Sequence, residues 1–258
     1  GKMQIIRSLW QGKLELSRDM AEVIYQCPTC NACSEICAYG INNTDLYEAL
    51  RAELVEAGCG LKSHEPMNKA MVERLNPYQR ENQEKKEWLK ELNFDVKDAT
   101  KEQAEVLYFV GCTAALTPDI RSVAVNTAKV LKKLDVDFSV LGENEVCCGS
   151  VAMRTGDRTA FNEVAQKNYN LFEKSGVKTI ITSCAGCYRT LRLDYKGVLD
   201  DLEIEVLHTI EYVLRVLKER GISLKHLGLN TTYHDPCHMG RHMGLYEVPR
   251  EMLRQIAD

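Results

Sequence analysis

Residues 106–112 read Val-Leu-Tyr-Phe-Val-Gly-Cys, a continuous apolar run that ends in a glycine and a cysteine. A short apolar run of this kind is typical of a strand that is buried on both faces of a parallel sheet. Two further runs follow the same plan: 138–141 precedes a loop with Cys147-Cys148-Gly149, and 179–182 ends in Ser183-Cys184. The sequence therefore predicts a sheet whose strands lead into cysteines.

Helical patterns separate these runs. Thr117-Pro118 is a typical helix start, and apolar residues recur at helical spacing up to Leu134 and again over 161–172. A further strand–helix pair is expected at 204–220, and residues 231–233 are expected as a last strand before Cys237. Strands that alternate with helices predict a parallel sheet with right-handed crossovers. We expect an α/β cysteine-rich domain over residues 101–258.

The cysteines of this half are expected at one edge of the sheet. Ligands of open parallel sheets bind beyond the carboxyl ends of the strands. Glycines at 111, 149 and 186 would let the backbone approach bulky inorganic sulfur closely. The pattern favours an iron–sulfur cluster, held by thiols that follow the strands: Cys112, Cys147, Cys148, Cys184 and Cys187.

Zinc is the alternative occupant. Cys184 and Cys187 with two other thiols would make a tetrahedral site, and the chain would then be a zinc-stabilised interaction module. Adjacent cysteines such as Cys147 and Cys148 have diverging side chains, which suits a larger cluster better than one small ion. Spacing favours iron–sulfur and leaves zinc open.

Residues 1–100 predict a small all-helical domain. Ser17 is a suitable N-cap for a helix that leads into Cys27-x2-Cys30-x2-Cys33-x3-Cys37, the spacing of bacterial ferredoxins. Thiolates two residues apart can wrap one face of a cubane [4Fe-4S] cluster. Cys37 either completes this site or serves a second cluster whose other ligands lie upstream of Gly1.

Two further features of this half are expected. Asp45-Leu-Tyr-Glu48 has the pattern of a capping box that begins a helix. The charge-rich stretch 79–105 is interpreted as a solvated helix and linker, with the domain boundary near residue 100.

Composition limits the possible functions. The 258 residues are 45% hydrophobic and 27% charged, with a net charge of −4, which argues against nucleic acid as a partner. No apolar run is long enough to span a bilayer, so contact with a membrane is expected only through a partner. Eleven cysteines in CxxC spacings favour reduced metal-binding thiols over disulfides. We expect a cytoplasmic protein, with any peripheral contact at the inner membrane face.

The pattern Cys112-x34-Cys147-Cys148-Gly149-x34-Cys184-x2-Cys187 resembles the CCG motif of heterodisulfide-reductase-type iron–sulfur subunits. Residues 177–189 and 233–242 also resemble segments of that family. Its members include the catalytic subunit of membrane-bound heterodisulfide reductase and the iron–sulfur subunits of glycolate and lactate dehydrogenases. The resemblance covers essentially the whole chain.

The resemblance implies that the five cysteines bind a noncubane [4Fe-4S] cluster. It also implies that Cys237 is the first ligand of a second CCG motif, which is incomplete here. A complete catalytic subunit carries two such motifs and cleaves a disulfide between the two clusters. We therefore expect a chain trimmed at both ends.

The expected function is an oxidoreductase subunit that passes electrons from the ferredoxin-type cluster to the CCG cluster for reduction of a small disulfide. The alternative is an electron-relay subunit of a flavin-dependent 2-hydroxy-acid dehydrogenase. Expected partners are other redox subunits: iron–sulfur proteins, flavoproteins or a cytochrome b-type membrane protein. His234 and His238 are candidate proton donors for a departing thiolate, with helix capping or loop hydrogen bonding as the alternative.

Overall fold

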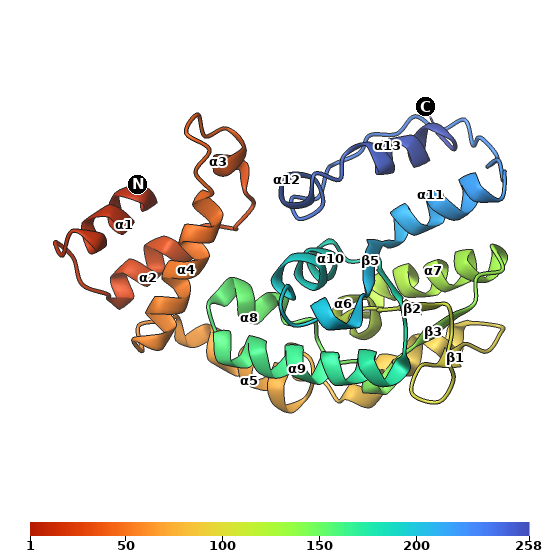
Figure 1. Ribbon diagram of the computed structural model, residues 1–258, viewed down its shortest axis with the longest axis horizontal. Coiled ribbons are helices and arrows are strands. Elements are labelled where there is room, and N and C mark those ends of the chain that lie inside the picture. The colour runs from red at the N-terminus through yellow and green to blue at the C-terminus, as the bar shows by residue number, and fades with distance from the viewer. Residues whose placement is uncertain (258) are drawn as a thin grey trace.

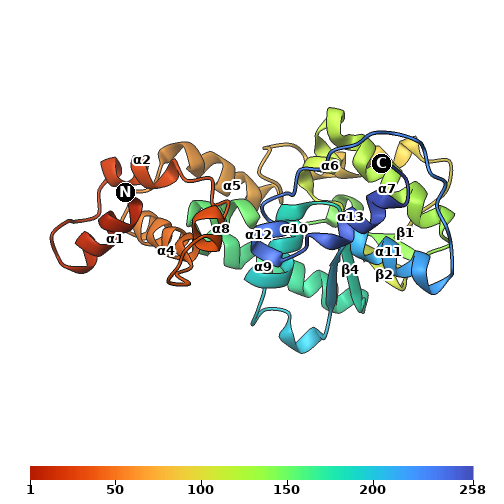
Figure 2. The ribbon, with the colours of Figure 1, turned by 90° about the horizontal axis from the view of Figure 1, so that it is seen from above.

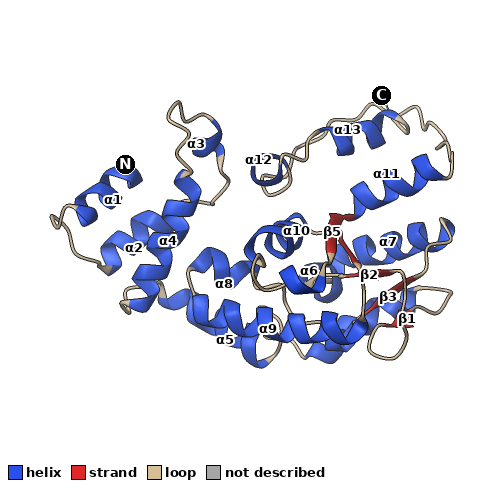
Figure 3. Ribbon diagram, in the orientation of Figure 1, coloured by secondary structure: helices blue, strands red, loops and turns tan. Residues whose placement is uncertain are grey.

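A five-stranded parallel sheet forms the centre of the larger part of the molecule, as Figure 3 shows. The structure, a computed structural model, describes residues 1–257, and its helical N-terminal region precedes the sheet. The predicted α/β class is confirmed. The strands, in the spatial order β1-β3-β2-β4-β5, are β1 (Lys97–Asp98), β3 (Phe138–Val140), β2 (Val106–Tyr108), β4 (Thr179–Thr182) and β5 (Glu205–His208).

The central strand β2 explains why its sequence is apolar without alternation. It pairs with strands on both sides, with Val106 opposite Phe138 in β3 and opposite Thr179 in β4. Its side chains Val106, Leu107 and Tyr108 are all fully buried, because helices cover both faces. Apolar residues are therefore required at every position of this strand.

The helices of this part connect the strands and cover the sheet. From β2 the chain crosses to β3, and it then returns past β2 to reach β4, so the direction of the crossovers reverses between β2 and β4. The carboxyl ends at such a reversal form the crevice in which open sheets bind ligands. The helices are α6 (Cys112–Leu116), α7 (Arg121–Lys133), α8 (Ser150–Thr155), α9 (Arg158–Ser175), α10 (Ala185–Arg189), η5 (Thr190–Asp194) and α11 (Thr209–Glu219).

The N-terminal helices extend away from the sheet, at the left of Figures 1 and 2. They pack around a small core of Met20, Ala21, Ile24, Leu50 and Leu54. The helices are α1 (Lys2–Trp10), α2 (Arg18–Tyr25), α3 (Ala32–Glu35) and α4 (Asn43–Glu56). The next helix, α5 (Glu65–Glu73), lies against α9 of the larger part.

Of the two helix starts predicted in this region, one is confirmed and the other is wrong. Ser17 caps α2, since its hydroxyl accepts a hydrogen bond from the N–H of Met20 at 3.3 Å. The predicted capping box at Asp45 is wrong. Asn42 caps α4 through the N–H of Asp45 at 3.3 Å, so the helix begins earlier than expected.

Residues 62–100 pack mainly with the sheet, and His64 also contacts Tyr25 of α2. Met71 of α5 and Trp88 of η2 (Asn82–Glu91) belong to the larger core. Lys85, in the stretch expected to be a solvated linker, is only 1% exposed. The domain boundary near residue 100 stays a prediction, with these contacts favouring an earlier one.

The C-terminal segment lies over the α7 and α11 side of the sheet and ends in α12 (Gly240–Met243) and α13 (Glu247–Arg254) (Figure 1). The strand predicted at 231–233 is wrong, because these residues form no regular secondary structure and are not part of the sheet in residues 1–257. Within residues 1–257, no helix has both the length and the apolar character needed to cross a bilayer.

Candidate functional site

Five thiols meet at the carboxyl ends of β2, β3 and β4. Cys112 opens α6 directly after β2, Cys147 and Cys148 follow β3, and Cys184 and Cys187 frame the turn after β4. Hydrogen bonds link the thiols in a chain that runs from Cys112 through Cys147, Cys148 and Cys187 to Cys184. We call this set the five-thiol site.

The contacts within the site change the acidity of its members. Hydrogen bonds from Cys147 and Cys187 lower the pKa of Cys148 to about 6, and a hydrogen bond from Cys187 lowers the pKa of Cys184 to about 6. The pKa of Cys187 is raised well above its ordinary value, first by its hydrogen bond with Cys148. Thiolates are thus favoured at Cys148 and Cys184 near neutral pH, and thiolates are the form that binds metals.

Backbone N–H groups support the thiolates. The N–H groups of Gly149 and Ser150 face the sulfurs of Cys147 and Cys148, respectively. The N–H of Cys187 lies 3.5 Å from the sulfur of Cys184. Donors of this kind stabilise the negative charge of cluster ligands.

The donor set fits a group with several metal atoms. Among residues 1–257, no three His, Cys, Asp or Glu side chains are arranged to hold one metal ion. Five sulfurs in an extended chain of contacts exceed the four ligands of a structural zinc ion, whereas iron–sulfur clusters offer several thiolate-binding irons. The chemistry of this set therefore fits an iron–sulfur cluster.

Two glycines let the loops close around the sulfurs. Gly111 has φ +82°, and a Cβ there would lie 3.2 Å from the sulfur of Cys187. Gly149 has φ +84°, and a Cβ there would lie 2.8 Å from Phe161. Both positions need glycine for its left-handed backbone and for its missing side chain.

Two buried side chains hold the Cys147-Cys148 pair. The Nδ2 group of Asn168 donates to the carbonyl oxygen of Cys147 and to the hydroxyl of Tyr195, both at 3.0 Å. The Tyr195 hydroxyl donates in turn to the carbonyl oxygen of Cys148 at 3.0 Å. These bonds satisfy buried carbonyls and fix the direction of both thiols.

A buried carboxylate holds the strand end before Cys112. Glu145, only 1% exposed, accepts hydrogen bonds from the N–H groups of Val110 at 2.8 Å and Gly111 at 2.9 Å. Lys85 donates to the carbonyl oxygen of Glu145. Sequence reasoning missed Lys85, Glu145, Asn168 and Tyr195, since no spacing rule marks these four residues.

The second cysteine region is the ferredoxin-type loop, residues 27–37. Cys33 is exposed, while Cys27, Cys30 and Cys37 are half-buried. Backbone hydrogen bonds from Ile41 and Tyr39 lower the pKa of Cys37. The loop presents its thiols along one short segment near the surface.

Segment 237–242 joins the two cysteine regions. The Nε of Arg241 donates to the carbonyl oxygen of Cys30 at 2.6 Å, and the Nε2 of His242 lies 2.8 Å from the carbonyl oxygen of Thr29. On the other side, Arg189 donates to the Nδ1 of His242 at 3.1 Å. Arg189 follows Cys187 by two residues, so a short path of contacts connects the ferredoxin-type loop with the five-thiol site.

Helix α4 also touches the cysteine-rich part closely. Arg51 donates to the carbonyl oxygens of Cys27 and of Arg154, the latter at 2.7 Å. Gly156 lies so close to α4 that a Cβ there would stand 2.4 Å from the backbone of Arg51. The two parts therefore meet in direct backbone contact.

A buried ion network lies at this joint. Arg154 pairs with Glu48 at 2.9 Å and with Asp194, and Arg189 pairs with Asp194 at 3.1 Å. Burial raises the pKa of Glu48 to about 7. A cavity of about 450 Å³ opens beside the network, lined in part by Asn31, Arg189 and His242.

Of the remaining candidate residues, His238 lies near the five-thiol site. His238 borders the Cys184–Cys187 turn, since a Cβ on Gly186 would lie 3.8 Å from its Nδ1. Burial lowers the pKa of His238 to about 4, so the ring is uncharged at neutral pH. His234 is exposed, and Cys237 is half-buried directly before His238. Their roles as proton donors and as a ligand stay predictions.

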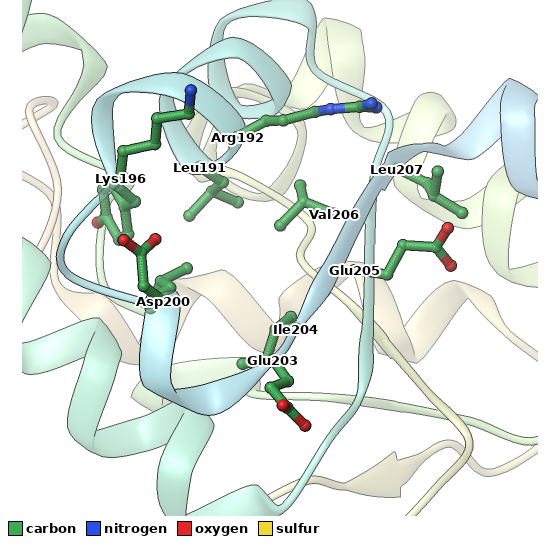
Figure 4. A pocket seen from close by; sticks show the side chains of 11 residues that line it. Leu191, Arg192, Lys196, Asp200, Glu203, Ile204, Glu205, Val206 and Leu207 are labelled. Atoms are coloured by element: carbon green, nitrogen blue, oxygen red, sulfur yellow. The ribbon is translucent and has the colours of Figure 1, made fainter.

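A second cavity, of about 380 Å³, lies along the edge strand β5 (Figure 4). Arg192 and Lys196 stand on one side of it, and Glu203 and Glu205 on the other. None of the five thiols, all of which the structure describes, lines this cavity. It lies beside the sheet and away from the carboxyl ends of the strands.

Comparison with known proteins finds a matching family model and several similar proteins. Residues 106–192 and 231–258 match the family model of the cysteine-rich domain CCG. One subunit of the dihydromethanophenazine:CoB–CoM heterodisulfide reductase of Methanosarcina mazei is 37% identical over 95% of this chain and 59% of its own length. No solved structure is significantly similar.

Two other similar proteins are named as oxidoreductases of other kinds. The probable iron-sulfur-binding oxidoreductase FadF of Bacillus subtilis is 30% identical over 91% of this chain and 34% of its own length. The EtfAB:quinone oxidoreductase of Syntrophomonas wolfei is 30% identical over 91% of this chain and 33% of its own length. The chain thus spans 59% or less of each of these relatives.

Proposed function

Because this chain belongs to the CCG cysteine-rich domain family of iron–sulfur redox subunits, we propose that it reduces a small disulfide within a larger redox complex. The relatives named above are oxidoreductases or oxidoreductase subunits, which supports an iron–sulfur redox role for the chain. The observation that carries the proposal is the five-thiol site itself. Its sulfurs come from three strand ends and are already in mutual contact.

We assign two cluster sites to the chain. Cys27, Cys30, Cys33 and Cys37 would hold a cubane [4Fe-4S] cluster, and the five-thiol site would hold a noncubane one. Cys237 would belong to a further motif. When bound, these groups supply one-electron chemistry, from the ferredoxin-type site to the CCG site, for reduction of the disulfide.

The residues around the five-thiol site suit this role. Four of the five thiols are buried, so their surroundings exclude water from the sulfurs. Asn168 and Tyr195 hold the backbone of the Cys147-Cys148 pair, and the contacts of Thr29, His242 and Arg189 keep the two cysteine regions adjacent. His238, beside the Cys184–Cys187 turn, would donate its N–H to a departing thiolate.

The second candidate is an electron-relay subunit without a disulfide substrate. The name of the Syntrophomonas wolfei relative, an EtfAB:quinone oxidoreductase, favours this interpretation. In that case the partners would be a flavoprotein on one side and a quinone-linked or cytochrome b-type membrane subunit on the other. The same thiols would be required.

Electron paramagnetic resonance during a redox titration separates the two candidates. Protein purified without oxygen is titrated with and without small candidate disulfides and their thiols. A signal that depends on the disulfide or thiol supports disulfide reduction. Two signals that titrate identically with and without these compounds support the relay and contradict disulfide reduction.

A further inference from the structure

Lys85 is a buried lysine that none of the cysteine patterns includes. Its side chain is only 1% exposed, although it lies in the charge-rich helix η2. Its neighbour Lys86 is in contrast a surface residue, paired with Glu143 at 2.6 Å. Lysine is almost never fully buried unless a partner compensates its charge. A compensating negative charge is therefore expected near Lys85.

One direct hydrogen bond of Lys85 goes to the loop that carries the Cys147-Cys148 pair, and another goes to the segment that follows α5. Its Nζ donates to the carbonyl oxygen of Leu75 at 3.0 Å and to that of Glu145. The Leu75 carbonyl also accepts the N–H of Cys147 at 2.9 Å. These acceptors are neutral, so they satisfy the donors of the ammonium group without neutralising its charge.

Lys85 lies close to two of the five thiols. Its acceptor Leu75 also binds the N–H of Cys147, and its acceptor Glu145 holds the strand end directly before Cys112. Lys85 thus places a positive charge beside both ligands.

Glu145 has a separate role at the same place. Its carboxylate accepts the N–H groups of Val110 and Gly111, directly before Cys112. It therefore positions one ligand, and its ionised form places a negative charge beside the thiols. The ammonium group of Lys85 and the carboxyl group of Glu145 lie at the same end of the five-thiol site.

We propose that Lys85 is a positioning residue that supplies a fixed positive charge to the five-thiol site and favours its more reduced state. Glu145 opposes this effect with its negative charge. The inference rests on the proposed function, because it takes the five thiols to hold a redox-active cluster. Net charge near a cluster is one of the factors that set its reduction potential.

The test is a redox titration of the intact protein, purified without oxygen and followed by electron paramagnetic resonance. Lys85→Met keeps most of the side-chain volume and removes the charge. The expected result is a more negative midpoint potential for the CCG cluster, because adding an electron then lacks the compensating charge. The ferredoxin-type cluster in the same molecule is expected to keep its midpoint, and the surface variant Lys86→Met is expected to change neither.

Glu145→Gln provides the decisive second variant. It removes a negative charge from the same place, so the midpoint of the CCG cluster is expected to move in the positive direction. General damage to the site would not produce opposite shifts in the two variants. Lys85→Arg, which keeps the charge, is expected to stay closer to the original midpoint than Lys85→Met.

The outcomes separate this inference from the proposed function. An unchanged CCG midpoint in Lys85→Met, or shifts of the same sign in Lys85→Met and Glu145→Gln, would overturn the inference alone. If Lys85→Met does not retain its CCG cluster, the direction of the shift in Glu145→Gln decides. Absence of any CCG signal in the unmodified protein would overturn the proposed function.

Discussion

The two cysteine regions differ in how far apart their thiols lie in the chain. The ferredoxin-type loop carries four thiols within residues 27–37, and these are exposed or half-buried. The five-thiol site collects sulfurs from three strand ends between residues 112 and 187, and four of them are buried. Local backbone determines the first arrangement, while the second depends on the whole sheet.

Because of this difference, the residues that support the two regions also differ. The loop is supported by its own turns, by backbone donors such as those that reach Cys37, and by Arg51 and Arg241, which bind its carbonyls. The five-thiol site needs Gly149, Asn168 and Tyr195 to hold the Cys147-Cys148 pair, and the buried Glu145 to hold the strand end before Cys112. Substitutions outside the ligands should therefore affect the five-thiol site more strongly than the loop.

The largest difference is expected from a matched pair of glycine substitutions. Gly149→Ala adds a methyl group 2.8 Å from Phe161 at a backbone of φ +84°, and we expect a loss of about 3–4 kcal/mol in unfolding free energy. Gly40→Ala, in the other region, has φ +66° and open space around it, so a loss of about 1 kcal/mol is expected. Denaturant unfolding of both variants measures the difference. Equal losses would contradict the comparison.

The stability of the protein is expected to depend on pH through Glu48, which lies at the contact between the two regions. Burial raises its pKa from 4.5 to about 7, so the folded protein holds this proton more tightly than the unfolded chain. The stabilisation is complete below pH 4.5 and is lost as the pH rises through about 7. It amounts to about 3.5 kcal/mol at most, since one pKa unit corresponds to about 1.4 kcal/mol.

Glu48→Gln tests this expectation. The variant should show a flatter dependence of the unfolding midpoint on pH over the weakly acid to neutral range. Part of the slope should remain, because burial also raises the pKa of Asp194 in the same network. A slope identical to that of the unmodified protein would exclude Glu48 as its source.

A smaller effect is expected from removing one hydroxyl behind the five-thiol site. Tyr195→Phe leaves the carbonyl of Cys148 and the amide of Asn168 without this partner, at a cost of about 1–3 kcal/mol. Tyr39→Phe, in a residue that is 89% exposed on the way out of the ferredoxin-type loop, should change stability by less than about 0.5 kcal/mol. Thermal unfolding of the two variants checks the contrast.

The smallest effect is expected at Cys59, a thiol outside both regions. Its sulfur lies 3.7 Å from the carbonyl oxygens of Leu16 and Ala57. Cys59→Ser preserves this weak donation, so iron content should stay unchanged and stability should change by about 0.5 kcal/mol or less. Loss of iron in this variant would show that Cys59 is a ligand.

Much of the fold could be predicted from local sequence patterns, such as apolar runs. The runs 106–110 and 179–182 lack charged positions because helices cover both faces, and this can be read directly from the sequence. The segment 231–233 has similar β-branched residues, yet it is not part of the sheet in residues 1–257. Strand formation depends on a neighbour, which sequence pattern alone does not reveal.

The cysteines of the candidate site could be predicted from the sequence, whereas the side chains that surround them could not. CxxC spacing and the adjacent pair identify ligands because metal geometry constrains them locally. Lys85 lies in a run of charged residues that reads as solvated, and only its tertiary packing buries it. Asn168 occupies an ordinary helical position in α9, and its partners are twenty or more residues away.

The central claim is that the five-thiol site holds a cluster of its own, separate from that of the ferredoxin-type loop. The most direct measurement compares Cys148→Ser with Cys33→Ser by iron and sulfide content and by electron paramagnetic resonance. Cys148→Ser is expected to lose the CCG signal and keep the ferredoxin-type signal, and Cys33→Ser is expected to do the reverse. Loss of both signals, or of neither, in Cys148→Ser would contradict the claim.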